Sequence, residues 1–115
     1  MKFVTVYKRN PDVEVIFEYN GVRKRNIFDG FSPVHMLPNG YLTSGLHHYM
    51  NASAIPPYGV AKGTITFITP ESYPNCLKIG SVIPIYDFPN IIGYATVTKL
   101  LNPILSFQDI GSLKK

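Results

Sequence analysis

Residues 91–103 read IIGYATVTKLLNP, and this stretch decides the fold class. Small or apolar residues stand at nearly every second position, namely Ile91, Gly93, Ala95, Val97 and, further on, Leu101. Between them stand Tyr94, Thr96, Thr98 and Lys99. Such alternation is typical of a β-strand with one buried face and one face in water. We therefore expect one long half-buried strand here, with Gly93 at a bend or at a close approach of another backbone.

Shorter alternating runs occur elsewhere, and turn-forming residues separate them. The strand-like runs are Lys2–Tyr7, Val13–Tyr19, Lys62–Thr69 and Ser81–Tyr86. The turn signals include Asn20-Gly21, which favours a hairpin, Pro38-Asn39-Gly40, and Asp87–Asn90, which joins two of the runs. No window of twelve residues shows a helical period. Several short strands between such turns predict an all-β barrel or sandwich in a single domain, residues 1–115.

Two segments follow no clear alternation. Residues 41–54 fit either a strand or a short helical turn. Residues 102–115 are expected to form an irregular tail, with Ile104–Phe107 packing back on the body.

Composition limits the kind of protein. The chain has 115 residues, of which 45% are hydrophobic and only 16% charged, and this suits a domain with a substantial core. A net charge of +4 permits an acidic partner, either nucleic acid or an acidic protein face. The single cysteine, Cys76, forms no internal disulfide and fits a reducing compartment. No apolar run suits a signal peptide or a membrane helix, so we expect a cytoplasmic protein with no membrane partner.

Four short motifs follow one another along residues 11–101. They are VEVIFEY at Val13–Tyr19 with GVRKRNIFDGFSP at Gly21–Pro33, TFITP at Thr66–Pro70, a strand introduced by Gly80, and GYATVTK at Gly93–Lys99. In this order they resemble the C-terminal β-barrel domain of elongation factor Tu, whose patterns include G-G-R-x-x-P-F-x-x-G-Y-R-P, T-L-I-x-P and G-x-G-V-V-x-K. The resemblance implies a stand-alone six-stranded antiparallel barrel of the translation-factor type, closed or nearly closed.

The resemblance also implies which functions to consider. The family's barrel helps to bind the acceptor–T stem of tRNA and contacts the nucleotide-exchange factor. This chain has no G-x-x-x-x-G-K-[ST] phosphate loop, so nucleotide hydrolysis by the family's mechanism is not expected. Ser32 and Asn90 stand where the family carries arginines, and Val34 stands where it carries glutamine. Serine and asparagine lack the planar donors with which arginine binds phosphate.

Residues suited to catalysis or metal binding are few. The histidines are His35, His47 and His48, and neighbours in a strand point to opposite faces, so His47 and His48 do not grip one metal. No nucleophile motif surrounds Cys76, and the seven carboxylates form no close pair in sequence. We therefore expect no metal, no cofactor and no enzyme activity, and a surface or interface role for the histidines.

The strongest polar cluster is Arg23-Lys24-Arg25. It suits a contact with phosphate or with an acidic protein face, and equally a solvated hairpin edge. The exposed aromatic residues that we expect nearby suit either base stacking or anchoring of a protein partner. The predicted binding residues are Arg23, Lys24, Arg25, Phe31, His35, Tyr41, His47, His48 and Tyr49.

Three functional hypotheses follow. The leading one is a non-catalytic module that binds a protein partner, either as an accessory or mimic of a translation factor or as an inhibitor or immunity-type protein. The alternative is tRNA-like RNA binding through Arg23–Arg25. An enzyme is the least expected, because it requires titratable side chains gathered in a pocket near His35, His47, His48 or Cys76.

Overall fold

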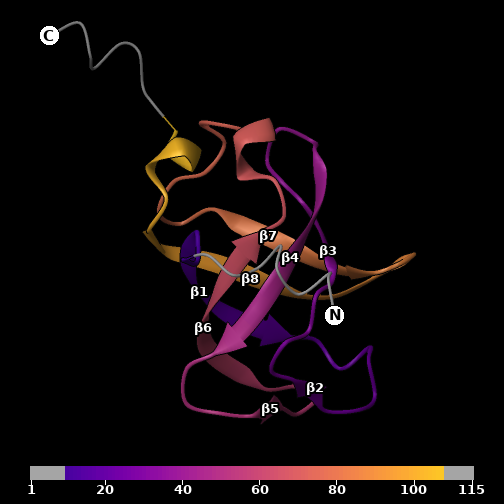
Figure 1. Cartoon of the computed structure of the whole chain (residues 1–115). Helices are drawn as coiled ribbons and strands as arrows, with labels where there is room; N and C mark the ends of the chain where they lie inside the picture. Colours follow the sequence, from indigo (N-terminus) through magenta and orange to yellow (C-terminus); the bar gives the residue numbers. More distant parts are fainter. Residues whose placement is uncertain (1–9, 108–115) are drawn as a thin grey trace, which may run out of the picture.

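The computed structural model describes residues 10–107, which form a closed antiparallel barrel of six strands (Figure 1). The order around the barrel is β1-β6-β4-β3-β7-β8, and pairing of β8 with β1 closes it. The predicted all-β, six-stranded barrel is thus confirmed. The barrel strands are β1 (Val13–Tyr19), β3 (Val34–Met36), β4 (Leu42–Tyr49), β6 (Val60–Phe67), β7 (Val82–Asp87) and β8 (Asn90–Leu100).

The smaller elements lie at the two ends of the barrel. A two-stranded sheet of β2 (Ile27–Phe28) and β5 (Ala54–Ile55) lies at the end where β1 and β4 finish (Figure 1). The 3₁₀ turns η2 (Pro70–Ser72) and η3 (Pro103–Leu105) lie together near the other end. The predicted strand at Lys2–Tyr7 lies outside the described residues.

Strand β8 is the long strand that the alternation predicts. It pairs with β7 on one side and with β1 on the other, and Gly93, Ala95 and Val97 face inward. Two residues of the predicted inner face are wrong. Ile92 rather than Ile91 is fully buried, and Leu101 lies beyond the end of the strand and is exposed. The pairing register with β7 shifts next to this point, and such an irregularity moves the following side chains to the opposite face.

The turns follow the sequence signals with one exception. The predicted turn at Asp87–Asn90 joins β7 to β8, and Pro38–Gly40 joins β3 to β4. Asn20-Gly21 is not a hairpin, because both edges of β1 are already paired, with β6 and with β8. The chain instead crosses the barrel end as residues 20–33, here called the lid. Residues 41–54 hold a strand, β4, and no helical turn.

The segment after β8 packs back on the barrel, as predicted. Leu105 is fully buried, and the backbone N–H groups of Leu101 and Asn102 donate to the Asp12 carbonyl at 2.9 and 3.0 Å. The buried Asp12 carboxylate accepts hydrogen bonds from the Phe67 N–H at 2.7 Å and from the Asn102 amide at 2.8 Å. These bonds hold the C-terminal segment against the start of β1 and the end of β6. Residues 108–115 of the predicted tail lie outside the described residues.

Gly93 makes closure of the barrel possible. A methyl group there would lie 2.5 Å from the backbone oxygen of Glu18 in β1, so the expected close approach of another backbone is confirmed. We expect Gly93→Ala to lower the free energy of unfolding by about 3 kcal/mol, because neither strand can move without loosening the pairing. In the control variant Gly45→Ala the new methyl meets side chains of Ile65 and His35, which adjust more easily. Urea denaturation compares the two variants, and equal losses would contradict this argument.

Candidate functional site

Four polar rings meet inside the barrel near the lid. Strand alternation turns Tyr19 of β1, His35 of β3, and His47 and Tyr49 of β4 toward the interior, and each is less than a tenth exposed. The Phe17 ring packs on His47 with ring centroids 4.4 Å apart and on Tyr49 at 5.2 Å. Polar rings in such an aromatic core require partners for their hydrogen-bonding atoms.

These rings form one continuous hydrogen-bond chain. The two tyrosine oxygens, Tyr49 Oη and Tyr19 Oη, are 2.8 Å apart, and Tyr19 Oη lies 3.3 Å from His47 Nδ1. His47 Nε2 and His35 Nε2 are 2.8 Å apart, and His35 Nδ1 lies 3.1 Å from the Pro84 carbonyl oxygen of β7. The chain therefore spans the interior from β4 near the lid to β7.

The partners assign a single direction to this chain. A carbonyl only accepts, so His35 carries its proton on Nδ1 and its Nε2 accepts from His47 Nε2–H. His47 Nδ1 is then an acceptor for the Tyr19 hydroxyl, whose oxygen accepts from Tyr49. Every polar atom of the chain has a partner when both imidazoles are neutral.

Burial keeps both imidazoles neutral. Desolvation lowers the pKa of His35 from 6.5 to about 4, with a smaller opposite effect from its bond to Pro84. Desolvation also lowers the pKa of His47 well below its usual range, and the nearby His35 lowers it further. Burial raises the pKa of Tyr49 to about 12 and that of Tyr19 further still, so both phenols stay protonated at neutral pH.

The predicted surface role of three residues is wrong. His35, His47 and Tyr49 were expected at a surface or interface, but they lie in the core and offer no contact to a partner. The reason is their register, since they share the inward face of β3 and β4 with residues such as Thr43 and Gly45. His48 points outward, as expected for the neighbour of an inward residue.

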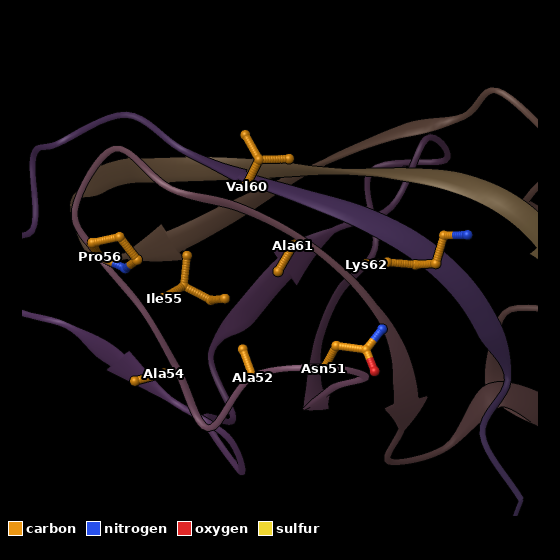
Figure 2. Close-up of a pocket in the computed structure, with 8 residues that line it drawn as sticks. All are labelled: Asn51, Ala52, Ala54, Ile55, Pro56, Val60, Ala61 and Lys62. Carbon is orange, nitrogen blue, oxygen red and sulfur yellow. The ribbon is translucent and has the colours of Figure 1, made fainter.

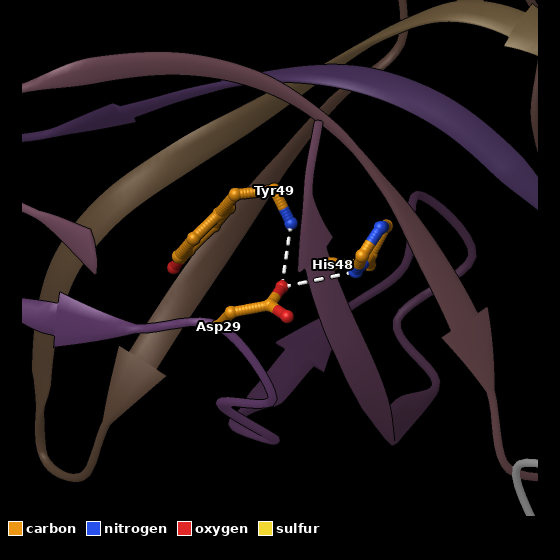
Figure 3. Close-up of polar contacts among 3 residues, drawn as sticks. All are labelled: Asp29, His48 and Tyr49. Carbon is orange, nitrogen blue, oxygen red and sulfur yellow. Dashed lines mark hydrogen bonds and ion pairs between the residues drawn. The ribbon is translucent and has the colours of Figure 1, made fainter. Parts of the chain in front are cut away.

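The lid is fastened to β4 beside this chain. Asp29 Oδ1 accepts the Tyr49 backbone N–H at 2.8 Å and lies 3.1 Å from His48 Nδ1 (Figure 3). The Gly30 N–H donates to the His47 carbonyl at 2.9 Å, and the His47 N–H donates to the Phe31 carbonyl at 2.8 Å. The Phe31 ring also meets the His47 ring edge-on at 5.7 Å.

The predicted basic cluster lies on the lid. Arg23 stacks over the Phe31 ring at 4.8 Å, whereas Lys24 and Arg25 are exposed. Most of the predicted binding residues therefore gather at the lid end, although only some of them reach the surface. Residues 10–107 carry six Lys or Arg and six Asp or Glu, so the net positive charge of the chain arises from its two ends.

Tyr41 lies apart from the other predicted residues. Its ring packs on Tyr73 at 4.9 Å, near the opposite end of the barrel, and it borders an open groove of about 410 Å³. Large apolar side chains around this groove are exposed: Tyr41 by 45%, Leu42 by 47%, Ile68 by 41% and Phe88 by 57%. We call these four side chains the groove face. No charged residue lines the groove, whose remaining lining residues are Val34, Thr43, Ser44 and Thr69.

A second hollow of about 390 Å³ lies between β5 and β6 (Figure 2). Its lining is mostly small and apolar, with Lys62 and Asn51 as the polar members. A third hollow of about 210 Å³ includes Cys76 and Lys78, but desolvation raises the pKa of the Cys76 thiol and disfavours the reactive thiolate.

Metal-ligating residues do not gather within residues 10–107, where no group of three or more His, Cys, Asp or Glu could hold an ion. Within the same range, no helix has the length and apolar character needed to cross a membrane.

Several residues of the site escaped the sequence reasoning. Tyr19 ends a run that was predicted as a strand, but its link to the histidines depends on pairing across the barrel. Ile68 and Phe88 lie next to turns, outside the alternating strands, so the sequence pattern does not predict that their side chains are exposed. Asp29 sits inside the quoted motif at Gly21–Pro33, and only the fold brings its carboxylate to β4.

The histidine pair makes stability depend on pH. The folded-state pKa of His35, about 4, lies below the unfolded value, so its contribution is complete above pH 6.5 and is lost as the pH falls toward 4. We expect the free energy of unfolding to fall by about 3 kcal/mol over this range, with His47 acting in the same direction. Urea denaturation at a series of pH values measures this. His48→Asn should keep the decline, and a flat wild-type profile would contradict the assignment.

No family model matches the chain, and no curated protein sequence matches it either. The likeness to elongation factor Tu therefore rests on the quoted motifs, and function has to be inferred from the site itself.

Proposed function

We propose that the protein is a non-catalytic binding module that recognises another protein through the groove face. The observation that carries this proposal is the exposure of Tyr41, Leu42, Ile68 and Phe88 around one uncharged groove. The outer face of an antiparallel barrel normally carries polar side chains. Apolar side chains that gather around a groove are typical of a surface that a partner covers.

The composition of the groove face suits a protein partner. Tyr41 is backed by the buried ring of Tyr73, and Phe88 is stacked on Tyr86 with ring centroids 4.8 Å apart. Aromatic side chains held in place by such packing lose little conformational freedom on binding, and they are frequent among the residues that dominate interface energies. The neighbouring hydroxyl groups of Ser44 and Thr69 supply polar contacts at the same surface.

The non-catalytic part of the proposal is supported by the histidine chemistry. His35 and His47 are buried, and all four of their ring nitrogens already have partners. A general base needs a free nitrogen within reach of a substrate. His48 is exposed and paired with Asp29, and it does not line the groove or the hollows that include Lys62, Asn102 and Cys76.

We also propose that the chain is a relative of the elongation factor Tu barrel that works in the cytoplasm. The support is the agreement between the motif order and the six-stranded closed barrel. On this proposal the protein acts as an accessory or mimic of a translation factor, or as an inhibitor or immunity-type protein that covers its target. The fold alone selects neither role.

RNA binding is the second candidate. Lys24 and Arg25 are exposed on the lid and have no ion pair within the described residues, which favours an anionic partner there. A surface that follows the phosphate backbone of RNA needs more cations, however. Residues 10–107 contain equal numbers of acidic and basic side chains. The groove face is therefore the better supported surface.

The test uses the tagged full chain in its native lysate, with and without ribonuclease, followed by binding of the purified partner. We expect a nuclease-resistant protein partner whose affinity falls about 30-fold in Leu42→Glu/Phe88→Ser, because this double variant removes two apolar anchors. Val60→Glu places the same charge on an exposed apolar residue outside the groove and should bind normally.

A second variant separates the two candidates. Lys24→Ala/Arg25→Ala removes the exposed charges of the lid and should leave protein binding within twofold. If the captured ligand is RNA, and if this variant rather than the groove variant loses it, the protein-binding proposal is wrong.

A further inference from the structure

The lid is fastened to the same strand that carries the buried histidine pair. Three hydrogen bonds connect Asp29, Gly30 and Phe31 of the lid to the backbone of His47 and Tyr49. All three bonds are made by His47 and Tyr49, two alternate residues of β4. The side chains of both residues belong to the hydrogen-bond chain. The state of the chain and the position of the lid are therefore coupled through one short stretch of strand.

The chain has no place for an additional proton. A proton on His35 Nε2 would face the N–H of His47 at 2.8 Å, where two donors would meet. A proton on His47 Nδ1 is compatible only if the Tyr19 hydroxyl turns and donates to Tyr49 instead. The Tyr49 hydroxyl would then have to donate elsewhere.

Tyr49 has no second acceptor in the closed structure. Tyr19 is the only hydrogen-bonding partner of its hydroxyl within the described residues, and its side chain is 2% exposed. Arg23 and Asp29 of the lid both act electrostatically on this phenol, which places the lid beside it. Water therefore reaches the Tyr49 hydroxyl when the lid moves away.

We propose that acid opens the lid: a proton taken up from water by the His35–His47 pair releases residues 27–31 from β4, while the barrel strands stay paired. Opening hydrates the charge on His47 and gives the displaced Tyr49 hydroxyl a water acceptor. A buried charge without such hydration is costly, so the open lid is the favoured form of the protonated protein.

Within the described residues, the groups that surround the His35–His47 pair do not stabilise an added proton in another way. From β1, the pair faces Phe17 and the neutral phenol of Tyr19; from β6, it faces Phe67. From β7 it meets the Pro84 carbonyl and the apolar residue Ile85, from β4 Tyr49, and from the lid the Phe31 ring. The nearby charged groups, Arg23 and Asp29, both belong to the lid and act on the tyrosines.

The lid can move without separating the barrel strands. Its strand β2 has two residues and pairs only with β5, whereas every barrel strand pairs on both sides. Opening residues 27–31 breaks the bonds of this small sheet and of the lid to β4 and exposes Ile27, but it leaves the pairing between barrel strands in place. His48 of β4 also contacts the lid, because its Nδ1 lies 3.1 Å from Asp29 Oδ1.

Hydrogen exchange followed by NMR on the full chain tests the proposal. Lid reporters are the Gly30 and Tyr49 amides, and barrel reporters are the Asp12 and Val97 amides, which donate to Ile65 and Ser81. Between pH 7 and about pH 4, we expect protection at the lid reporters to fall tenfold or more, after correction for intrinsic exchange, with the barrel reporters still protected. The fall should coincide with titration of the His35 and His47 ring signals.

Two variants sharpen this test. The double variant His35→Phe/His47→Phe keeps the ring volume and should hold the lid closed at low pH, whereas His48→Asn should still open. Ring titration without any change at the lid reporters overturns the proposal, and so does a fall of protection at the lid reporters that is no larger than the fall at the barrel reporters. These wild-type results decide the matter even if the double variant fails to fold.

Discussion

The pairing of β8 with β1 is the constraint on which the rest of the structure depends. It converts an open sheet into a barrel in which each of the six described strands has a neighbour on both sides. The close approach at Gly93 permits this pairing. Because the sheet is closed, its inward face is sealed, and polar residues that alternation turns inward must find their partners inside. Function is correspondingly left to the outer face and to the segments that cross the two ends.

The buried hydrogen-bond chain is the main consequence of this closure. Four rings from three strands satisfy one another and end on a backbone carbonyl of a fourth strand, and they do so with one assignment of protons. Satisfied networks in a core of low polarity strengthen each bond and make any change in protonation expensive. The same chain therefore stabilises the barrel while both imidazoles are neutral. It also links the interior to the lid, because Tyr49 of β4 belongs to the chain and donates its backbone N–H to Asp29 of the lid.

The proposed functions belong to different parts of the barrel surface. The groove face offers uncharged apolar and aromatic side chains over β4 and the β7–β8 turn, which is the chemistry of a protein interface. The lid carries exposed cations and lies over the buried histidine pair. Our two proposals therefore place protein recognition at the groove face and a response to pH at the lid.

The sequence by itself determined the fold class, the strand β1, most of β8 and the turns at Pro38–Gly40 and Asp87–Asn90, because alternation and turn chemistry are local properties. Only the tertiary structure decided that Asn20-Gly21 starts a lid, since this depends on whether the edges of β1 are already occupied. The same holds for His35, His47 and Tyr49, which the sequence marked as polar residues of interest without showing where they lie. Their burial and their bonds to Tyr19 and Pro84 join strands up to 49 residues apart along the chain, and no local pattern records such a distance.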